Sequence, residues 1–153
     1  MVQEAKEQKE FTRRRKQFLR MVGNGNIAVI ASASILHRNR DVEYPFRQDS
    51  DFFYLSGFDE PDAVLVFAPG RKQGEYVLFC RELDKTTALW VGANAGLEGA
   101  VNDYNADDAF PMDDIDDILP GLMENKNRLY FPMGVHPSFD QQLMEDRKST
   151  RLN

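Results

Sequence analysis

The sequence is poor in the side chains that hold transition metals and form disulfides. Its 153 residues include one cysteine, Cys80, and two histidines, His37 and His136. A single cysteine excludes an internal disulfide and any multi-cysteine zinc site. The two histidines lie far apart in sequence, so a transition-metal site within the chain is not expected. Cys80 is predicted to be a small buried side chain in a strand, and a reducing cytoplasm is the simplest compartment for such a chain.

Net positive charge and long apolar runs are lacking as well. The formal net charge is -6 and the pI is about 4.9. This balance argues against nucleic acid as a partner, because binding it requires a basic face, and against an anionic membrane surface. There is no run of about 18 apolar residues, which a transmembrane helix needs. The segment Met1–Glu7 contains acids and no apolar stretch, so no secretory signal is expected.

Complete catalytic motifs are also missing. No Gly-x-Ser-x-Gly nucleophile elbow is present. The segment Gly92–Gly96 lacks the Gly-Lys-Ser/Thr ending of a phosphate-binding loop. The segment Asp103–Asp107 imitates the start of a calcium-binding loop, but Asp108 stands where glycine is required. The residues alone therefore predict no self-contained catalytic set.

The most distinctive feature present is the stretch Asp41–Phe67. It combines large aromatic side chains with hydrogen-bonding ones, which a surface loop or a plain core strand rarely does. The aromatics are Tyr44, Phe46, Phe52, Phe53, Tyr54 and Phe58, and the polar residues between them are Arg47, Gln48, Asp49, Ser50 and Asp51. This mixture predicts a buried polar network with aromatic walls, which is costly unless every member is paired. The network is either a structural clamp between a strand and a helix or part of a functional face.

Apolar periodicity predicts a mixed β-sheet with helices on both faces, an α/β fold. The run Ile27–Ala33 is almost continuously apolar, as in a strand buried on both faces. The other predicted strands are Ala63–Phe67, Glu75–Arg81, Ala109–Pro111 and Arg128–Phe131, the first two forming a hairpin. Helices are predicted over Lys9–Val22, Asp51–Leu55, Asp84–Trp90, Leu97–Tyr104, Asp113–Met123 and Pro137–Arg147.

Particular residues set the expected ends of these helices. Gly23 and Gly25 follow the first helix and tolerate positive φ. Ser50 is expected to cap the short helix that Gly57 ends. Pro120 lies inside a predicted helix and is expected to break or kink it.

Trp90 is the only tryptophan, and it precedes a glycine-rich stretch. A tryptophan in this position can anchor an interface or form the wall of a pocket. It can equally be a core residue beneath a loop. The sequence alone leaves both alternatives open.

The segment Tyr44–Phe58 reads Tyr-Pro-Phe-Arg-Gln-Asp-Ser-Asp-Phe-Phe-Tyr-Leu-Ser-Gly-Phe. With its continuation through Phe67 it resembles the N-terminal domain of bacterial Xaa-Pro aminopeptidases (aminopeptidase P), in the creatinase/prolidase N-terminal domain family. The segment Phe11–Gln17 is similar to that family's opening helix, and Leu83–Gly92 is similar to the segment after its hairpin. The resemblance implies a domain of ribonuclease H-like motif over residues 1–147, with residues 148–153 as a linker or an added tail.

The resemblance also implies an activity that these residues do not complete. Enzymes of this family join the domain to a C-terminal "pita-bread" domain, which binds two metal ions, usually manganese, through two Asp, one His and two Glu. A metal-bridging hydroxide attacks the bond between an N-terminal residue and a following proline. No such ligand motif occurs in this chain, so no catalytic or metal-binding residue is assigned here, and the chain alone is expected to be inactive.

The implied partners are the chain's own catalytic domain, further copies in a homo-oligomer and a proline-containing peptide, all in the cytoplasm. Trp90 resembles the family tryptophan that approaches a neighbouring subunit's active site. Tyr54, Arg47 and Asp51 are expected at the substrate pocket or an interface. If Arg47 is buried against a carboxylate, its replacement by alanine is expected to cost about 2–4 kcal/mol.

Two other functions are compatible with the same expected fold. One is a non-enzymatic protein-interaction module. The other is the N-terminal domain of a creatinase-like C–N hydrolase that acts on a small molecule.

Overall fold

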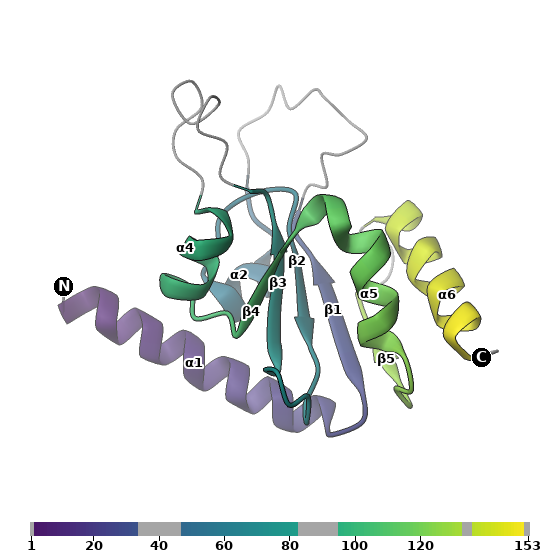
Figure 1. Cartoon of the computed structure of the whole chain (residues 1–153). Helices are drawn as coiled ribbons and strands as arrows, with labels where there is room; N and C mark the ends of the chain where they lie inside the picture. The colour runs from purple at the N-terminus through teal and green to yellow at the C-terminus, as the bar shows by residue number, and fades with distance from the viewer. Residues whose placement is uncertain (1, 34–46, 83–94, 133–135, 152–153) are drawn as a thin grey trace.

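One mixed sheet of five strands forms the centre of the molecule. The computed structural model describes residues 2–33, 47–82, 95–132 and 136–151. The strand order is β4-β3-β2-β1-β5. The strands are β1 (Ile27–Ala31), β2 (Val64–Phe67), β3 (Tyr76–Cys80), β4 (Asp108–Pro111) and β5 (Leu129–Tyr130) (Figure 1).

The sheet combines both kinds of pairing. β2 pairs antiparallel with β1 and with β3, and the β2–β3 pair confirms the predicted hairpin. β5 pairs parallel with β1, and β4 pairs parallel with β3. Both edge strands therefore run in the same direction as β1 and β3.

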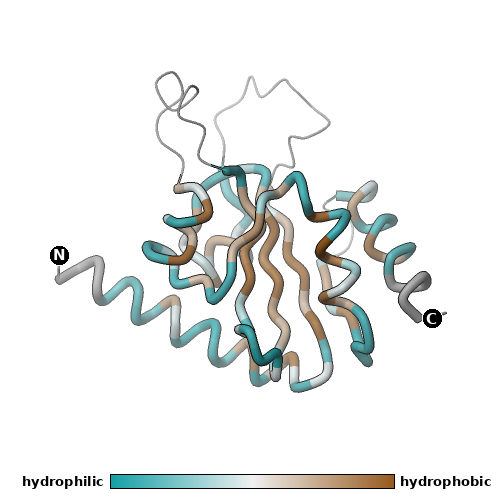
Figure 2. Tube along the Cα trace, in the orientation of Figure 1, coloured by the Kyte–Doolittle hydropathy of each residue, from teal (hydrophilic) through white to brown (hydrophobic). Residues whose placement is uncertain are grey.

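Helices cover both faces of the sheet, as the sequence predicts. They are α1 (Val2–Val22), α2 (Ser50–Ser56), α4 (Gly96–Asn102), α5 (Ile115–Met123) and α6 (Pro137–Arg151), with a 3₁₀ turn η1 (Met112–Asp114) before α5. α1, α2 and α4 pack on one face, and α5 and α6 on the other. Figure 2 shows the apolar strands between these two helical layers. None of the helices in the described ranges is long and apolar enough to cross a bilayer.

Strand β1 shows why its apolar run is continuous. Ala28 and Ile30 pack into the core beneath α1 and α2, whereas Ile27 and Val29 pack into the core beneath α5 and α6. Successive side chains of a strand point to opposite faces, so burial of both faces requires apolar residues at every position.

The short helix α2 begins one residue earlier than predicted and has a different cap. Asp49, not Ser50, is the N-cap, and its carboxylate accepts a hydrogen bond from the Phe52 N–H at 3.0 Å. Gly57 ends the helix in the left-handed conformation, with φ of 70°, which confirms its predicted role. The helix predicted over Asp84–Trp90 lies outside the described residues.

Pro120 was expected to break or kink its helix, and the expectation of a break is wrong. α5 continues through Pro120 without a break. Leu119 and Met123 on its inner face are fully buried, and this packing outweighs the backbone hydrogen bond that the proline cannot donate. α6 extends to Arg151 rather than ending at Arg147.

Candidate functional site

The polar network of the signature stretch centres on Gln48. Its Oε1 accepts hydrogen bonds from the backbone N–H of Ala33 and of Asp49, both at 3.0 Å. Its Nε2 donates to the backbone carbonyls of Phe58 at 3.1 Å and Glu60 at 2.9 Å. One half-buried amide therefore joins the segment after β1 to the segment after α2. This amide forms a clamp between a strand and a helix, one of the two alternatives that the sequence leaves open. The buried network is smaller than predicted, because Arg47, Ser50 and Asp51 are exposed.

The four site residues predicted from the sequence lie in different settings. Arg47 is exposed, so it is not buried against a carboxylate and the cost estimated for that case does not apply. Asp51 is also exposed, and Tyr54 is half exposed. Asp51 and Tyr54 line the same surface groove, which Arg47 does not line. Trp90 lies outside the described residues.

The aromatic residues of the stretch divide between the core and the surface. Phe52 and Phe58 are fully buried, whereas 43% of Phe53 and 50% of Tyr54 is exposed. Successive helical positions point in different directions, so α2 buries one side and presents the other. The aromatic wall is therefore complete only on the side that faces the sheet.

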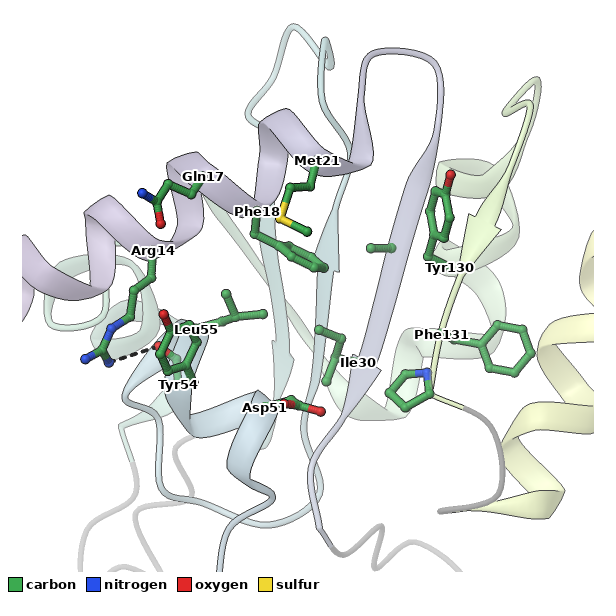
Figure 3. A pocket seen from close by; sticks show the side chains of 12 residues that line it. Arg14, Gln17, Phe18, Met21, Ile30, Asp51, Tyr54, Leu55, Tyr130 and Phe131 are labelled. Carbon is green, nitrogen blue, oxygen red and sulfur yellow. Dashed lines mark hydrogen bonds between the residues drawn. The ribbon is translucent and has the colours of Figure 1, made fainter.

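A largely apolar groove of about 500 Å³ opens beside α1, α2 and β5. Figure 3 shows α1 and α2 on one side of it, β1 at its base and Tyr130 of β5 on the other side. Its apolar lining comes from Phe18 and Met21 of α1, Leu55 of α2 and Ile30 of β1. A concave apolar surface with a few polar groups at its rim is the usual form of a binding site.

Arg14 provides the cationic part of the groove's rim. Its guanidinium lies 4.3 Å from the centre of the Tyr54 ring and donates to the Tyr54 carbonyl at 3.3 Å. Its Nε also lies 3.4 Å from the Glu10 carboxylate. These contacts hold both Arg14 and Tyr54 in place, since a cation over an aromatic face is attracted to it.

Arg15 is a buried residue that the sequence analysis missed, because its neighbours in the chain are basic. It stands between Arg14 and Lys16, yet only 5% of it is exposed. Its guanidinium donates to the Leu55 carbonyl at 3.0 Å and lies 4.7 Å from the centre of the Tyr76 ring. Burial lowers the pKa of Arg15. The signal available in the sequence was its spacing, because Arg15 lies four residues before Leu19 and seven before Val22, on the apolar face of the helix.

The remaining candidate ligands act as structural contacts. His136 Nε2 lies 2.6 Å from the Ser32 carbonyl, so this nitrogen must carry the proton, and the contact joins the start of α6 to the end of β1. Asp107 accepts from the backbone N–H groups of Glu75 and Tyr76 at 3.1 and 3.0 Å. Within the ranges that the structure describes, no group of three or more His, Cys, Asp or Glu side chains is arranged to hold a metal ion. His37 lies outside those ranges.

Cys80 is the buried strand cysteine that the sequence predicts, with no exposed surface. Burial raises the pKa of its thiol to about 12, and burial also raises the pKa of Tyr76. The unfolded groups titrate near their usual pKa values, about 8.5 and 10. At a pH between the unfolded and the folded pKa of either group, the unfolded chain has released a proton that the folded chain still retains.

We therefore expect the free energy of unfolding to fall as the pH rises from about 8.5 towards 12. Urea denaturation at a series of pH values measures this. Cys80→Ala should remove the contribution of the thiol, so that the free energy of unfolding falls less steeply as the pH rises from about 8.5. A free energy of unfolding that stays constant up to pH 11 would contradict the burial of both groups.

Comparisons with known proteins agree with this fold. Residues 11–130 match the family described as "Aminopeptidase P, N-terminal domain". The Xaa-Pro aminopeptidase of Escherichia coli (strain K12) is 34% identical over 149 residues, which cover 94% of this chain and 34% of that protein. The structure of Pseudomonas aeruginosa aminopeptidase PepP matches with a TM-score of 0.86 and 51% identity, over 94% of this chain and 33% of that one. Proline aminopeptidase P II from Yersinia pestis gives a TM-score of 0.83 and 34% identity over the same shares. The chain thus spans about a third of the length of these proteins.

Proposed function

The chain belongs to the family of aminopeptidase P N-terminal domains, and from this membership we propose that it is the assembly and pocket-covering domain of a dimetal Xaa-Pro aminopeptidase. The complete enzyme would hydrolyse the bond between an N-terminal residue and a following proline. One observation carries the proposal: 94% of the chain aligns with about a third of a protein named Xaa-Pro aminopeptidase.

The two metal ions that the family implies do not fit the described part of this chain, which contains no cluster of ligating side chains. We therefore assign the manganese ions, and the residues that bind them, to a further part of the polypeptide. The role of this chain is to shape and cover the site, because excluding water strengthens electrostatic interactions within it.

The residues proposed for this role are Tyr54, Asp51, Arg47 and Trp90. Tyr54 and Asp51 lie at the apolar groove, where they are available to a neighbouring domain or subunit. Arg47 is exposed in the segment that precedes α2 and would contribute charge to the same docking face. Trp90 would form an apolar wall of a substrate pocket in a homo-oligomer, which suits a proline ring.

The polypeptide encoded by the complete gene tests the proposal. Loaded with manganese, it is expected to release the N-terminal residue from an Xaa-Pro peptide and to be inactive on the same peptide with alanine in place of proline. The 153-residue chain alone is expected to be inactive. Cleavage by that chain alone, or a gene that encodes no metal-binding half, would overturn the proposal. Partner binding without hydrolysis would favour an interaction module.

Trp90→Ala in the complete enzyme is expected to lower kcat/KM for an Xaa-Pro peptide by about tenfold, or about 1.4 kcal/mol of transition-state stabilisation. The Tm should change by no more than a few degrees, as expected for about 1 kcal/mol or less. The control is Phe53→Ala, because Phe53 is a half-exposed aromatic to which no role in the pocket is assigned. A large fall in Tm with unchanged kcat/KM would identify Trp90 as a core residue.

A further inference from the structure

The turn between α1 and β1 contains an asparagine followed by a glycine, Asn24 and Gly25. The Asn26 N–H donates to the Gly23 carbonyl at 3.2 Å, which closes a β-turn with Asn24 and Gly25 at its two central positions. Gly25 has a φ of 86° and Asn24 a negative φ, as in a type II turn. Glycine adopts this conformation without strain, and its lack of a side chain leaves its nitrogen open to approach.

The backbone nitrogen of Gly25 is free although the residue itself is fixed. The Asn127 N–H donates to the Gly25 carbonyl at 2.8 Å. In a type II turn the hydrogen bond joins the first carbonyl to the fourth N–H, so the N–H of the third residue takes no part in it. Within the part of the chain that the structure describes, the Gly25 N–H has no acceptor and the exposed Asn24 side chain has no hydrogen-bond partner. The side-chain amide carbon of Asn24 is therefore accessible to the nitrogen of the next residue.

Asn26, two residues later, provides a contrast in the same turn. Its side-chain Nδ2 donates to the Val22 carbonyl at 2.8 Å, and the N–H of the residue after it, Ile27, donates to the Arg128 carbonyl at 2.9 Å. Ile27 is also fully buried, and its branched side chain hinders approach to its nitrogen. Both hydrogen bonds would have to break before Asn26 could react with its neighbour.

We propose that Asn24 is a site of spontaneous deamidation, through a succinimide formed with Gly25. Hydroxide takes the Gly25 amide proton, and the nitrogen bonds to the side-chain carbon of Asn24 while the bond from that carbon to its own amide nitrogen breaks and ammonia leaves. Water then opens the ring at either carbonyl. The products are an aspartate and an isoaspartate, in which the main chain runs through the former side-chain carbon. The reaction consumes only water, and asparagine is a thermolabile residue for this kind of reason.

Ageing of the complete polypeptide at physiological temperature and mildly alkaline pH tests the proposal. The tryptic peptide of residues 21–38 holds both asparagines, so fragmentation in a mass spectrometer compares them in one sample. Replacement of the amide NH₂ by OH raises the mass by about one dalton. Asn24 is expected to gain this mass about tenfold or more faster than Asn26, which must first lose two hydrogen bonds. Part of the product should accept a methyl group from a protein-isoaspartate methyltransferase, which identifies the isoaspartate.

Asn24→Gln is the control, because the longer side chain would have to close a six-membered ring. This variant should lose the fast gain in mass. Equal rates at Asn24 and Asn26, or a fast gain that persists in Asn24→Gln, would overturn the proposal. Deamidation without any isoaspartate would also overturn it, since the amide would then be hydrolysed directly. An Asn24 that reacts in denaturing urea and stays intact in the folded polypeptide would do the same, because the fold would then keep the two groups apart. The reaction involves no metal ion, so these results do not depend on the proposed peptidase function.

Discussion

Gln48→Ala is expected to lower the free energy of unfolding by about 2–4 kcal/mol. The substitution removes four hydrogen bonds to backbone groups of separate segments, each worth about 0.5–1.5 kcal/mol net. Water can reach the half-buried site and will recover part of the loss, which keeps the expected cost below the sum of the upper values. Urea denaturation at pH 7 measures the change.

Arg47→Ala is the matched control, because Arg47 adjoins Gln48 in sequence and is exposed. It should change the free energy of unfolding by no more than about 0.5 kcal/mol. Equal costs for the two substitutions would contradict the assignment of Gln48 as the centre of the clamp.

Gln48→Glu separates the donor from the acceptor. The glutamate can still accept from Ala33 and Asp49, but its second oxygen would face the carbonyls of Phe58 and Glu60. A carboxylate there is repelled by both carbonyls, so the folded state should raise the pKa of the introduced group. The variant is therefore expected to regain stability as the pH falls towards 4, where a protonated carboxyl can donate again.

The architecture could be predicted from the sequence because the burial of a strand or helix determines the order of apolar and polar residues along it. The continuous apolar run of β1 predicts helices on both faces, and the turn Ala68–Gly74 between two apolar runs predicts the β2–β3 hairpin. Helix ends were less predictable, since adjacent residues such as Asp49 and Ser50 can both serve as caps.

The identity of the residue at the centre of the clamp could not be predicted. Arg47, Gln48 and Asp49 are consecutive, and each can form several hydrogen bonds. The choice among them depends on backbone groups of Ala33 and Phe58, which are brought together only by the tertiary fold. The groove is a second example, because Met21 and Tyr130 lie at opposite ends of the chain and carry no common sequence signal.

Phe58→Ala is expected to cost the most of the substitutions considered, about 3–5 kcal/mol. The Phe58 ring has no exposed surface, and it packs edge-on to Tyr104 with ring centres 5.0 Å apart and against Phe52 at 6.4 Å. Its removal leaves a cavity between α2 and the segment that follows α4. Thermal or urea denaturation will measure the loss.

Phe53→Ala is the control from the same aromatic run. Phe53 is 43% exposed, and its ring makes one edge-on contact with Phe11 at 5.9 Å. Such a contact is worth about 0.5–1.5 kcal/mol, so the substitution should cost about 1 kcal/mol. Similar losses for the two variants would contradict the division of these aromatics between core and surface.

A variant that combines Gln48→Ala with Phe58→Ala tests whether the clamp and the core stabilise each other. Gln48 bonds the backbone carbonyl of Phe58, and this bond holds the segment in the position from which the Phe58 ring enters the core. In a chain that already lacks the Phe58 ring, removing the Gln48 amide should therefore lower the free energy of unfolding by less than it does in the native chain. The cost of the double substitution is therefore expected to fall short of the sum of the single costs by about 0.5–3 kcal/mol. Strict additivity would mean that Gln48 only satisfies local backbone groups and does not position the core aromatic.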